Sequence, residues 1–202
     1  LLSNSSGQDN VAIGPSALST NTIGGSNIAI GGASLYSNTS GSYNLAVGLE
    51  TMFSNTTGSY NTAIGSLSLL GNSTGSNNLA IGYSALHANS TGFQNVAVGN
   101  EAMSANETGS GNTGLGFFSM GWNASGISNT AVGNHSLYAN ETGSFNTAIG
   151  VAALHSSEGR SNLVALGDSA LYNNSVNATD AWQGIENTAL GSKTLYANTT
   201  GS

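Results

Sequence analysis

The stretch NLAIGYSALHANSTGFQ, residues 78–94, is one copy of a seventeen-residue unit that the chain repeats about eleven times. An Asn followed four residues later by a Gly marks each copy, and this Asn recurs every seventeen residues from Asn10 to Asn146. The marker Gly continues in the same register to Gly167. A short period sustained along a chain is typical of stacked repeats. Residues 1–202 are therefore predicted to form a single repeat array, which we expect to be a fragment of a longer chain.

The regular register breaks near the C-terminal end. The last intact copy begins at Asn187, and its marker Gly191 follows Gly167 by 24 residues instead of seventeen. Seven extra residues are therefore expected around residues 173–183. The wider segment 157–186 is interpreted as the irregular part of an otherwise uniform array.

Two interpretations of this irregular segment stay open. Asn162 stands one residue early for a marker Asn, and Val164 looks like an added residue. A loop that departs from a regular scaffold is a common place for binding specificity. Asn173, Asn177 and Trp182 are therefore candidate residues of a binding loop. A neutral insertion at a turn that tolerates extra residues explains the same pattern.

The composition is poor in charge. Only 5% of the residues are charged, and the net charge is −7, whereas roughly a quarter of the residues of a globular domain are charged. In a stack of coils, equivalent residues lie about 4.8 Å apart, and like charges at that spacing repel. Arg160 and Lys193 are the whole basic complement, so no nucleic-acid partner is expected. The chain has no Cys for a thiolate metal site, and no apolar run long enough for this fragment to insert into a membrane.

Each copy contains one clear strand pattern. With the marker Asn as position 0, position 3 is Ile, Val or Leu from Ile13 to Ile149, and position 2 is Ala except at Gly114. In an extended strand, positions 1 and 3 share one face and position 2 points to the other. A large apolar face backed by a small one predicts a five-residue strand that packs tightly on both sides. The Gly at position 4 is expected to end it.

The second half of the copy has its own anchors. Position 8 is always Leu or Met, which indicates a core position, although a Leu and Met stripe that binds a partner is the alternative. We expect this residue on a second short strand. Asn at position 11 and Gly at position 14 then indicate a turn. Stacked copies predict an all-β fold, a parallel β-solenoid or β-roll whose 17-residue coils pair in register.

A coil of this size has a thin core. It offers only about three large apolar side chains, whereas ordering each residue costs on the order of 1.5 kcal/mol. The small Ala at position 2, such as Ala80, suggests the close approach of another chain. We therefore expect the coils of three chains to intertwine as a homotrimer.

The repeat resembles a known group of sequences. The segments NTAIG and NVAVG followed by xxAL, as in residues 61–69, 95–103 and 146–154, are similar to the head repeats of YadA-like trimeric autotransporter adhesins. They look still closer to the NTAIGxxALxxNTTG arrays of bacterial surface proteins and phage tail-fibre proteins. This resemblance covers almost the whole chain and implies a trimeric, left-handed parallel β-roll that acts as an adhesive head, stalk or fibre. The NxTG turn makes this unit longer than the adhesin-head repeat. The matching positions are scaffold, so the resemblance assigns no binding residue.

The turn at positions 11–13 matches the acceptor pattern for N-glycosylation again and again. The acceptor residues of this column are Asn4, Asn38, Asn55, Asn72, Asn89, Asn106, Asn123, Asn140 and Asn198. One interpretation is a secreted rod that carries glycans along an edge of exposed turns. The other is that Asn, Thr and Gly are favourable turn residues in their own right, since Asn21 keeps the Asn while Ile23 breaks the acceptor pattern.

Catalytic and metal chemistry have little support in the sequence. His87 and His155 share position 9 but are four coils, roughly 19 Å, apart, and His135 falls at another position, so no metal or other cofactor is expected. Aromatic residues recur at position 9 and just before the marker Asn, where packing competes with a sugar-binding ladder as the explanation. Only Glu141 and Glu158 approach the paired carboxylates of a glycoside hydrolase. An enzyme is therefore not expected.

These observations favour a structural or adhesive rod, part of an extracellular or cell-surface fibre, filament, stalk or adhesin that associates with itself. A host-surface or glycan ligand fits such a rod. The alternative is a module that binds ice or a polysaccharide through flat ladders of Asn and Thr. Thr62 and Thr113 share position 1 with Leu45, Leu79 and Val96, and this irregularity favours the structural hypothesis.

Overall fold

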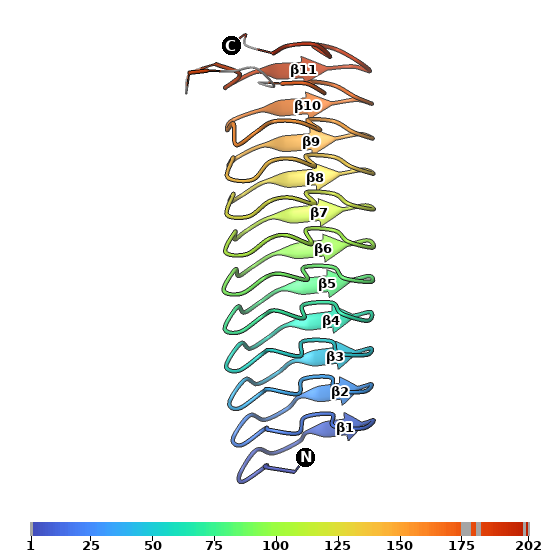
Figure 1. Cartoon of the computed structure of the whole chain (residues 1–202), viewed down its shortest axis with the longest axis vertical. Helices are drawn as coiled ribbons and strands as arrows, with labels where there is room; N and C mark the ends of the chain where they lie inside the picture. Colours follow the sequence, from blue (N-terminus) through green and yellow to red (C-terminus); the bar gives the residue numbers. More distant parts are fainter. Residues whose placement is uncertain (1, 175–178, 181–182, 200, 202) are drawn as a thin grey trace.

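The chain forms a rod of stacked coils with a parallel sheet along its length. The computed structural model describes residues 2–174, 179–180, 183–199 and 201. Within these residues, eleven strands follow one another in sequence order across one sheet, with β1 and β11 at opposite ends of the rod (Figure 1). The strands are β1 Val11–Ile13, β2 Ile28–Ile30, β3 Leu45–Val47, β4 Thr62–Ile64, β5 Leu79–Ile81, β6 Val96–Val98, β7 Thr113–Leu115, β8 Thr130–Val132, β9 Thr147–Ile149, β10 Val164–Leu166 and β11 Thr188–Leu190.

Neighbouring strands pair in parallel and in register. Val11 lies opposite Ile28, and the same step of seventeen residues carries the pairing on to Val164 in β10. The predicted parallel β-solenoid with seventeen-residue coils is thus confirmed. The step from Val164 to Thr188 in β11 is 24 residues. This longer step equals one coil plus the seven extra residues expected from the sequence.

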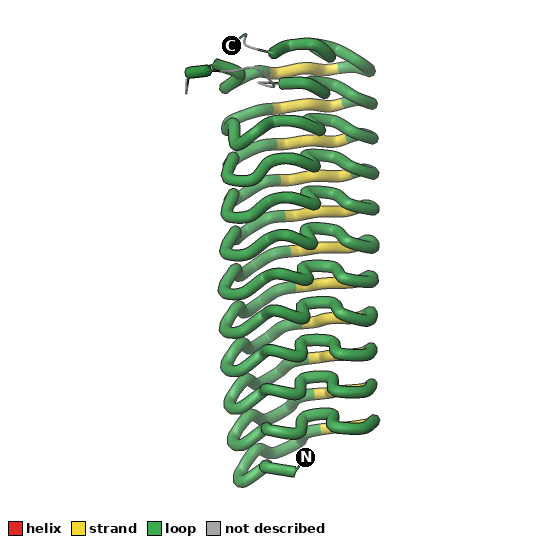
Figure 2. Tube along the Cα trace, in the orientation of Figure 1, coloured by secondary structure: helices red, strands yellow, loops and turns green. Residues whose placement is uncertain are grey.

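Each described coil contains one strand rather than the two that the sequence suggested. The strands are three residues long, and turns and loops complete the coil (Figure 2). The Leu or Met at position 8 does not have strand geometry, because its φ is positive, for example 49° at Leu35 and 51° at Met52. Its backbone still bonds to the next coil, since the N–H of Leu35 donates to Thr51 O at 2.9 Å. Stacking therefore holds this half of the coil without a second sheet.

The two faces of the strand have the opposite roles to those predicted. The Ala of position 2 points inward, and Ala46, Ala63 and Ala80 are fully buried. They pack in one apolar core with the Leu and Met residues of position 8, such as Leu86. The larger side chains of positions 1 and 3 point outward and are half-buried or exposed in every described strand. Ala80 therefore faces the core of its own chain, so the inference of a second chain against it was wrong.

One coil shows how closely this core is filled. Gly114 replaces the usual Ala in β7, and a Cβ atom built on it would lie 3.0 Å from Cγ of Met103. Met103 is fully buried. The flexible Met side chain therefore occupies space that the missing methyl group leaves, which is the gap-filling role expected of Met at position 8.

Left-handed backbone at four positions produces the bends of the coil. The Gly of position 4 has φ between 116° and 140°, and a Cβ atom at Gly99 would lie 2.5 Å from the carbonyl oxygen of Gly116 in the next coil. Positions 6, 8 and 16 also have positive φ, although most of these residues are not Gly. The left-handed region costs such residues roughly 1–2 kcal/mol each. Neighbouring coils must therefore hold these residues in place.

Two ladders of buried Asn side chains run along the rod. At position 0, Nδ2 of Asn61 donates to Gly75 O at 2.9 Å, and its Oδ1 accepts from the backbone N–H of Asn78 at 3.0 Å. At position 11, Nδ2 of Asn72 donates to the same Gly75 O at 3.0 Å and to Oδ1 of Asn55 in the preceding coil at 2.8 Å. Each coil thus satisfies the buried polar groups of its neighbour.

The irregular segment keeps the register of the stack. Leu163 is fully buried and stands at position 0 in place of the marker Asn, while Val164 pairs with Thr147 of β9. Val164 is therefore not an added residue, and that interpretation is corrected. The extra residues lie in the turn between positions 11 and 14. Nδ2 of Asn174 donates to Gly184 O ten residues further on, a bond that spans three residues in regular coils.

Candidate functional site

The outward side of the sheet is an apolar strip along the rod, which we call the sheet face. Positions 1 and 3 of β1 to β11 form it, and its most exposed members are Val11, Ile13, Ile28, Ile30, Ile64, Ile149 and Leu190. Position 3 is apolar from Ile13 in β1 to Leu190 in β11, whereas position 1 is Thr in β4, β7, β8, β9 and β11. An exposed apolar strip of this kind commonly marks a contact surface.

The predicted glycosylation acceptors do not lie on an exposed edge. In the regular coils Asn38, Asn55, Asn72, Asn89, Asn106, Asn123 and Asn140 are fully buried. Nδ2 of Asn89 donates to Oδ1 of Asn72 at 2.8 Å and to Gly92 O at 3.0 Å, which engages both of its N–H groups. The folded coil leaves no space for a sugar on such a nitrogen, so the expected exposure is wrong for these residues. Asn4 is exposed and Asn198 half-buried, and glycosylation of these two stays a prediction.

Aromatic side chains at position 9 stack along the rod. The longest stack consists of Tyr138, His155, Tyr172 and Tyr196. Neighbouring ring centroids lie 4.7 to 5.1 Å apart, and Tyr36 and Phe53 form a shorter stack at 5.0 Å. Because each ring covers the face of the next, these ladders pack the rod and offer few ring faces to a sugar.

A second histidine lies next to His155 of this stack. The rings of His135 and His155, in neighbouring coils, have centroids 6.2 Å apart. Burial and, to a smaller extent, the neighbouring His135 lower the pKa of His155 from its ordinary value of 6.5. The pair was not predicted, because His135 stands at position 6 and His155 at position 9; one diagonal step between neighbouring coils brings these two positions together. Within the described residues, no group of three or more His, Cys, Asp or Glu is placed to hold a metal ion.

Of the three residues of the candidate binding loop, the structure describes only Asn173. Asn173 is half-buried in the stack, and its backbone N–H donates to Tyr196 O at 3.1 Å. Asn177 and Trp182 lie outside the described residues. Asn173 therefore belongs to the regular coil, and a binding role for all three residues stays a prediction.

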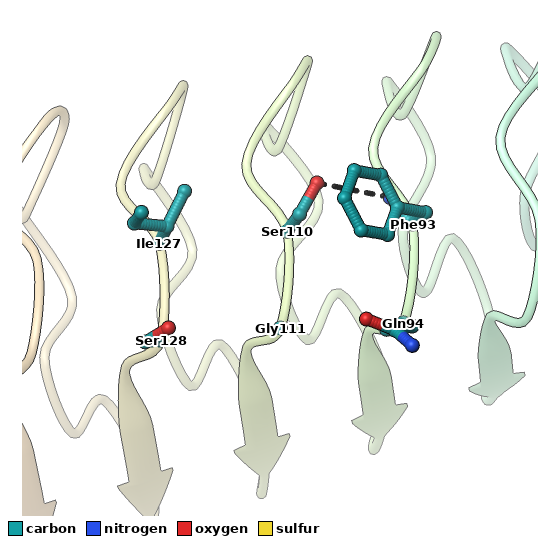
Figure 3. Close-up of a pocket in the computed structure, with 6 residues that line it drawn as sticks. All are labelled: Phe93, Gln94, Ser110, Gly111, Ile127 and Ser128. Atoms are coloured by element: carbon teal, nitrogen blue, oxygen red, sulfur yellow. Dashed lines mark hydrogen bonds between the residues drawn. The ribbon is translucent and has the colours of Figure 1, made fainter.

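A depression opens at positions 15 and 16, the turn that leads into the strand. It has a volume of about 290 Å³ and is lined by Phe93, Gln94, Ser110, Gly111, Ile127 and Ser128. We call this depression the notch. Figure 3 shows Phe93 and Ile127 on either side of Ser110, with Gly111 below. Phe93 is 52% exposed and Ile127 is 42% exposed, and Oγ of Ser110 accepts the backbone N–H of Phe93 at 3.1 Å.

Comparison with known proteins identifies no related protein. No family model, no curated protein and no solved structure matches the chain. A search of the described residues for a helix long and apolar enough to cross a membrane finds none.

Proposed function

We propose that the chain is a non-catalytic structural and adhesive rod, part of an extracellular or cell-surface fibre, filament, stalk or adhesin. In this proposal, three copies of a left-handed coil associate through the sheet face. The observation that carries it is the continuous apolar strip from β1 to β11, whose members Ile13 and Ile64 are 56% and 38% exposed. A threefold axis beside this strip gives each copy two identical neighbours and removes apolar surface from water.

The regular stack supports the structural part of the proposal. Parallel pairing connects every strand from β1 to β11, and the Asn ladders add bonds between coils at two further positions, as Asn61 and Asn72 illustrate. A repeat of this kind gains length by adding coils and keeps its cross-section unchanged. Such a uniform rod suits spacing and presentation better than it suits a catalytic cleft.

The association state is the direct test. Light scattering of the wild-type protein is expected to give the mass of three chains. Ile81→Glu places a charge within the sheet face and is expected to release single chains. Asn77→Glu is the matched control, because Asn77 is exposed on another side and Glu186 has the same left-handed φ at this position, 57° against 59°. A wild-type protein that is a folded monomer would refute self-association.

A second candidate function is binding of ice or a polysaccharide surface by the sheet face. Thr113, Thr130 and Thr147 are direct partners in β7, β8 and β9, so they form a short regular ladder of outward hydroxyl groups. Inhibition of ice recrystallisation that Thr130→Val abolishes would support this candidate. A wild-type protein without such activity and without polysaccharide binding at the sheet face would eliminate it.

A further inference from the structure

We propose that the notch binds one ring of a neutral glycan chain, so that the turn side of the rod serves as its adhesive surface. This inference deepens the adhesive part of the proposed function and rests on it. It places the ligand on a surface separate from the sheet face. Association and adhesion therefore use different residues and can be tested independently.

The fold does not require the notch. Gly111 has a φ of 69°, but its neighbours at position 16, Gln94 and Ser128, have φ of 56° and 54° with ordinary side chains. A Cβ atom built on Gly111 would meet no atom closer than 3.6 Å. Neither the backbone nor the packing therefore excludes a side chain at this position. The absence of one leaves an open site between two larger side chains.

Two apolar side chains bound the notch along the rod. Phe93 and Ile127 belong to coils on either side of the coil that carries Ser110, as Figure 3 shows, so their backbones are two coils or roughly 10 Å apart. The two apolar side chains therefore flank the notch along the rod, with Ser110 and Gly111 between them.

The lining matches a ring with apolar faces and a polar edge. All six lining residues are uncharged. Oγ of Ser110 is engaged with Phe93 N–H and with Thr108 O, but the side chains of Gln94 and Ser128 form no hydrogen bond with other described residues. A pyranose ring offers C–H groups to the walls and hydroxyl groups to this free amide and hydroxyl. An ionic ligand would find no opposite charge among these residues.

The same side of the rod carries further exposed rings at position 16. Tyr43, Tyr60 and Phe145 are 57%, 59% and 58% exposed, and the rings of Tyr43 and Tyr60 stack at 4.9 Å. A second depression of about 340 Å³ includes Gly25 and Ser26, at the positions equivalent to Ser110 and Gly111. Repeated contact sites along one side fit a chain of sugars better than a single small molecule.

The test uses the whole chain and neutral hexasaccharides of glucose and N-acetylglucosamine as probes. Titration calorimetry measures affinity, and nuclear magnetic resonance follows the Gly111 N–H and the Gln94 side-chain amide. Gly111→Asn fills the notch without altering the backbone, because Asn77 and Asn162 stand at the same position 16 of their coils and have φ of 59° and 60°. Phe93→Ala removes one wall. Phe117→Ala is the control, since Phe117 is 44% exposed outside the notch.

We expect at least one probe to bind, to shift both resonances and to lose about tenfold or more in affinity in Gly111→Asn and in Phe93→Ala. Phe117→Ala should bind as the wild type does. If Gly111→Asn binds the probe as tightly as the wild type, the notch is not the glycan site, although the proposal of an adhesive rod would still stand. Absence of binding to every probe, or shifts with benzyl alcohol alone, would overturn a glycan site. Loss of self-association with retained glycan binding would instead count against the proposed trimer.

Discussion

Replacement of Asn89 by Ala removes one rung of the Asn ladder at position 11 in the middle of the rod. Oδ1 of Asn72 loses the donor that lies 2.8 Å away, and one N–H group of Asn106 loses its acceptor, also at 2.8 Å. Gly92 O keeps a second donor, Nδ2 of Asn78 at 2.9 Å. Two buried polar groups are thus left without their partner. At about 1–3 kcal/mol each, the expected loss in the free energy of unfolding is roughly 2–6 kcal/mol.

Urea unfolding followed by circular dichroism measures this loss. Asn134→Ala is the control, because Asn134 is exposed and also fits the glycosylation pattern; it should change stability by less than about 0.5 kcal/mol. Asn89→Asp should be worse than Asn89→Ala at neutral pH, because it sets a carboxylate oxygen against two acceptors. Burial raises the pKa of such a carboxyl, so the deficit should grow as the pH rises above about 4. If Asn89→Ala and Asn134→Ala are equally stable, the ladder does not hold the coils together.

Three further predictions address the stack. The pKa of His155 is lowered in the folded protein, so the unfolded state binds a proton at this residue more readily. The free energy of unfolding should therefore be highest above pH 6.5 and should decline as the pH falls below that value. His155→Phe should remove this part of the pH dependence of the urea midpoint. Gly99→Ala forces a strained φ of 135° and places Cβ 2.5 Å from a carbonyl oxygen, so it should lower the thermal midpoint by at least the equivalent of about 1–3 kcal/mol, whereas Asn100→Ala, which removes only the exposed acceptor of the Tyr83 N–H, should lower it less. Deletion of residues 176–182 restores the regular spacing of positions 11 and 14 and should leave the circular dichroism spectrum and cooperative unfolding unchanged.

The repeat made the axial organisation of the fold predictable. Because the marker Asn recurs at a constant interval, parallel in-register pairing follows from the sequence alone, and so does the longer step before β11. The apolar character of position 8 likewise predicted a core column, which Leu86 and Met103 occupy. These features depend only on which residues recur at a fixed interval, and that recurrence can be read directly from the sequence.

The path of the chain within a coil was harder to predict. The strand pattern alone could not decide which face pointed inward, and the large side chain of Ile64 proved to be outside while Ala63 was inside. The bends at positions 6, 8 and 16 use ordinary residues such as Glu50 and Leu35 with positive φ, so, apart from Gly111, no Gly or Pro marks them. Neighbouring coils impose this conformation, and local sequence preference does not record it.

The burial of the position 11 Asn had one indication in the sequence. Asn21 keeps the amide although Ile23 has replaced the residue that an acceptor for glycosylation needs. The structure explains why, since Nδ2 of Asn21 donates to Asn4 and to Gly24. The notch had a comparable indication in Gly111, the Gly of position 16, which an alignment of the copies would have isolated as an exception.

The in-register step gives the rod a discrete length. Each coil contributes one strand, one rung of each Asn ladder and about 4.8 Å of height, and none of these can be added in part. A change of one or two residues would shift every later side chain out of its column unless a turn absorbs it, as the turn between Asn174 and Gly184 absorbs its seven extra residues. Gain or loss of a complete coil would leave all other contacts as they were. The length of the rod therefore changes in steps of one coil. Duplication or loss of whole units is the way in which the reach of such a protein can evolve.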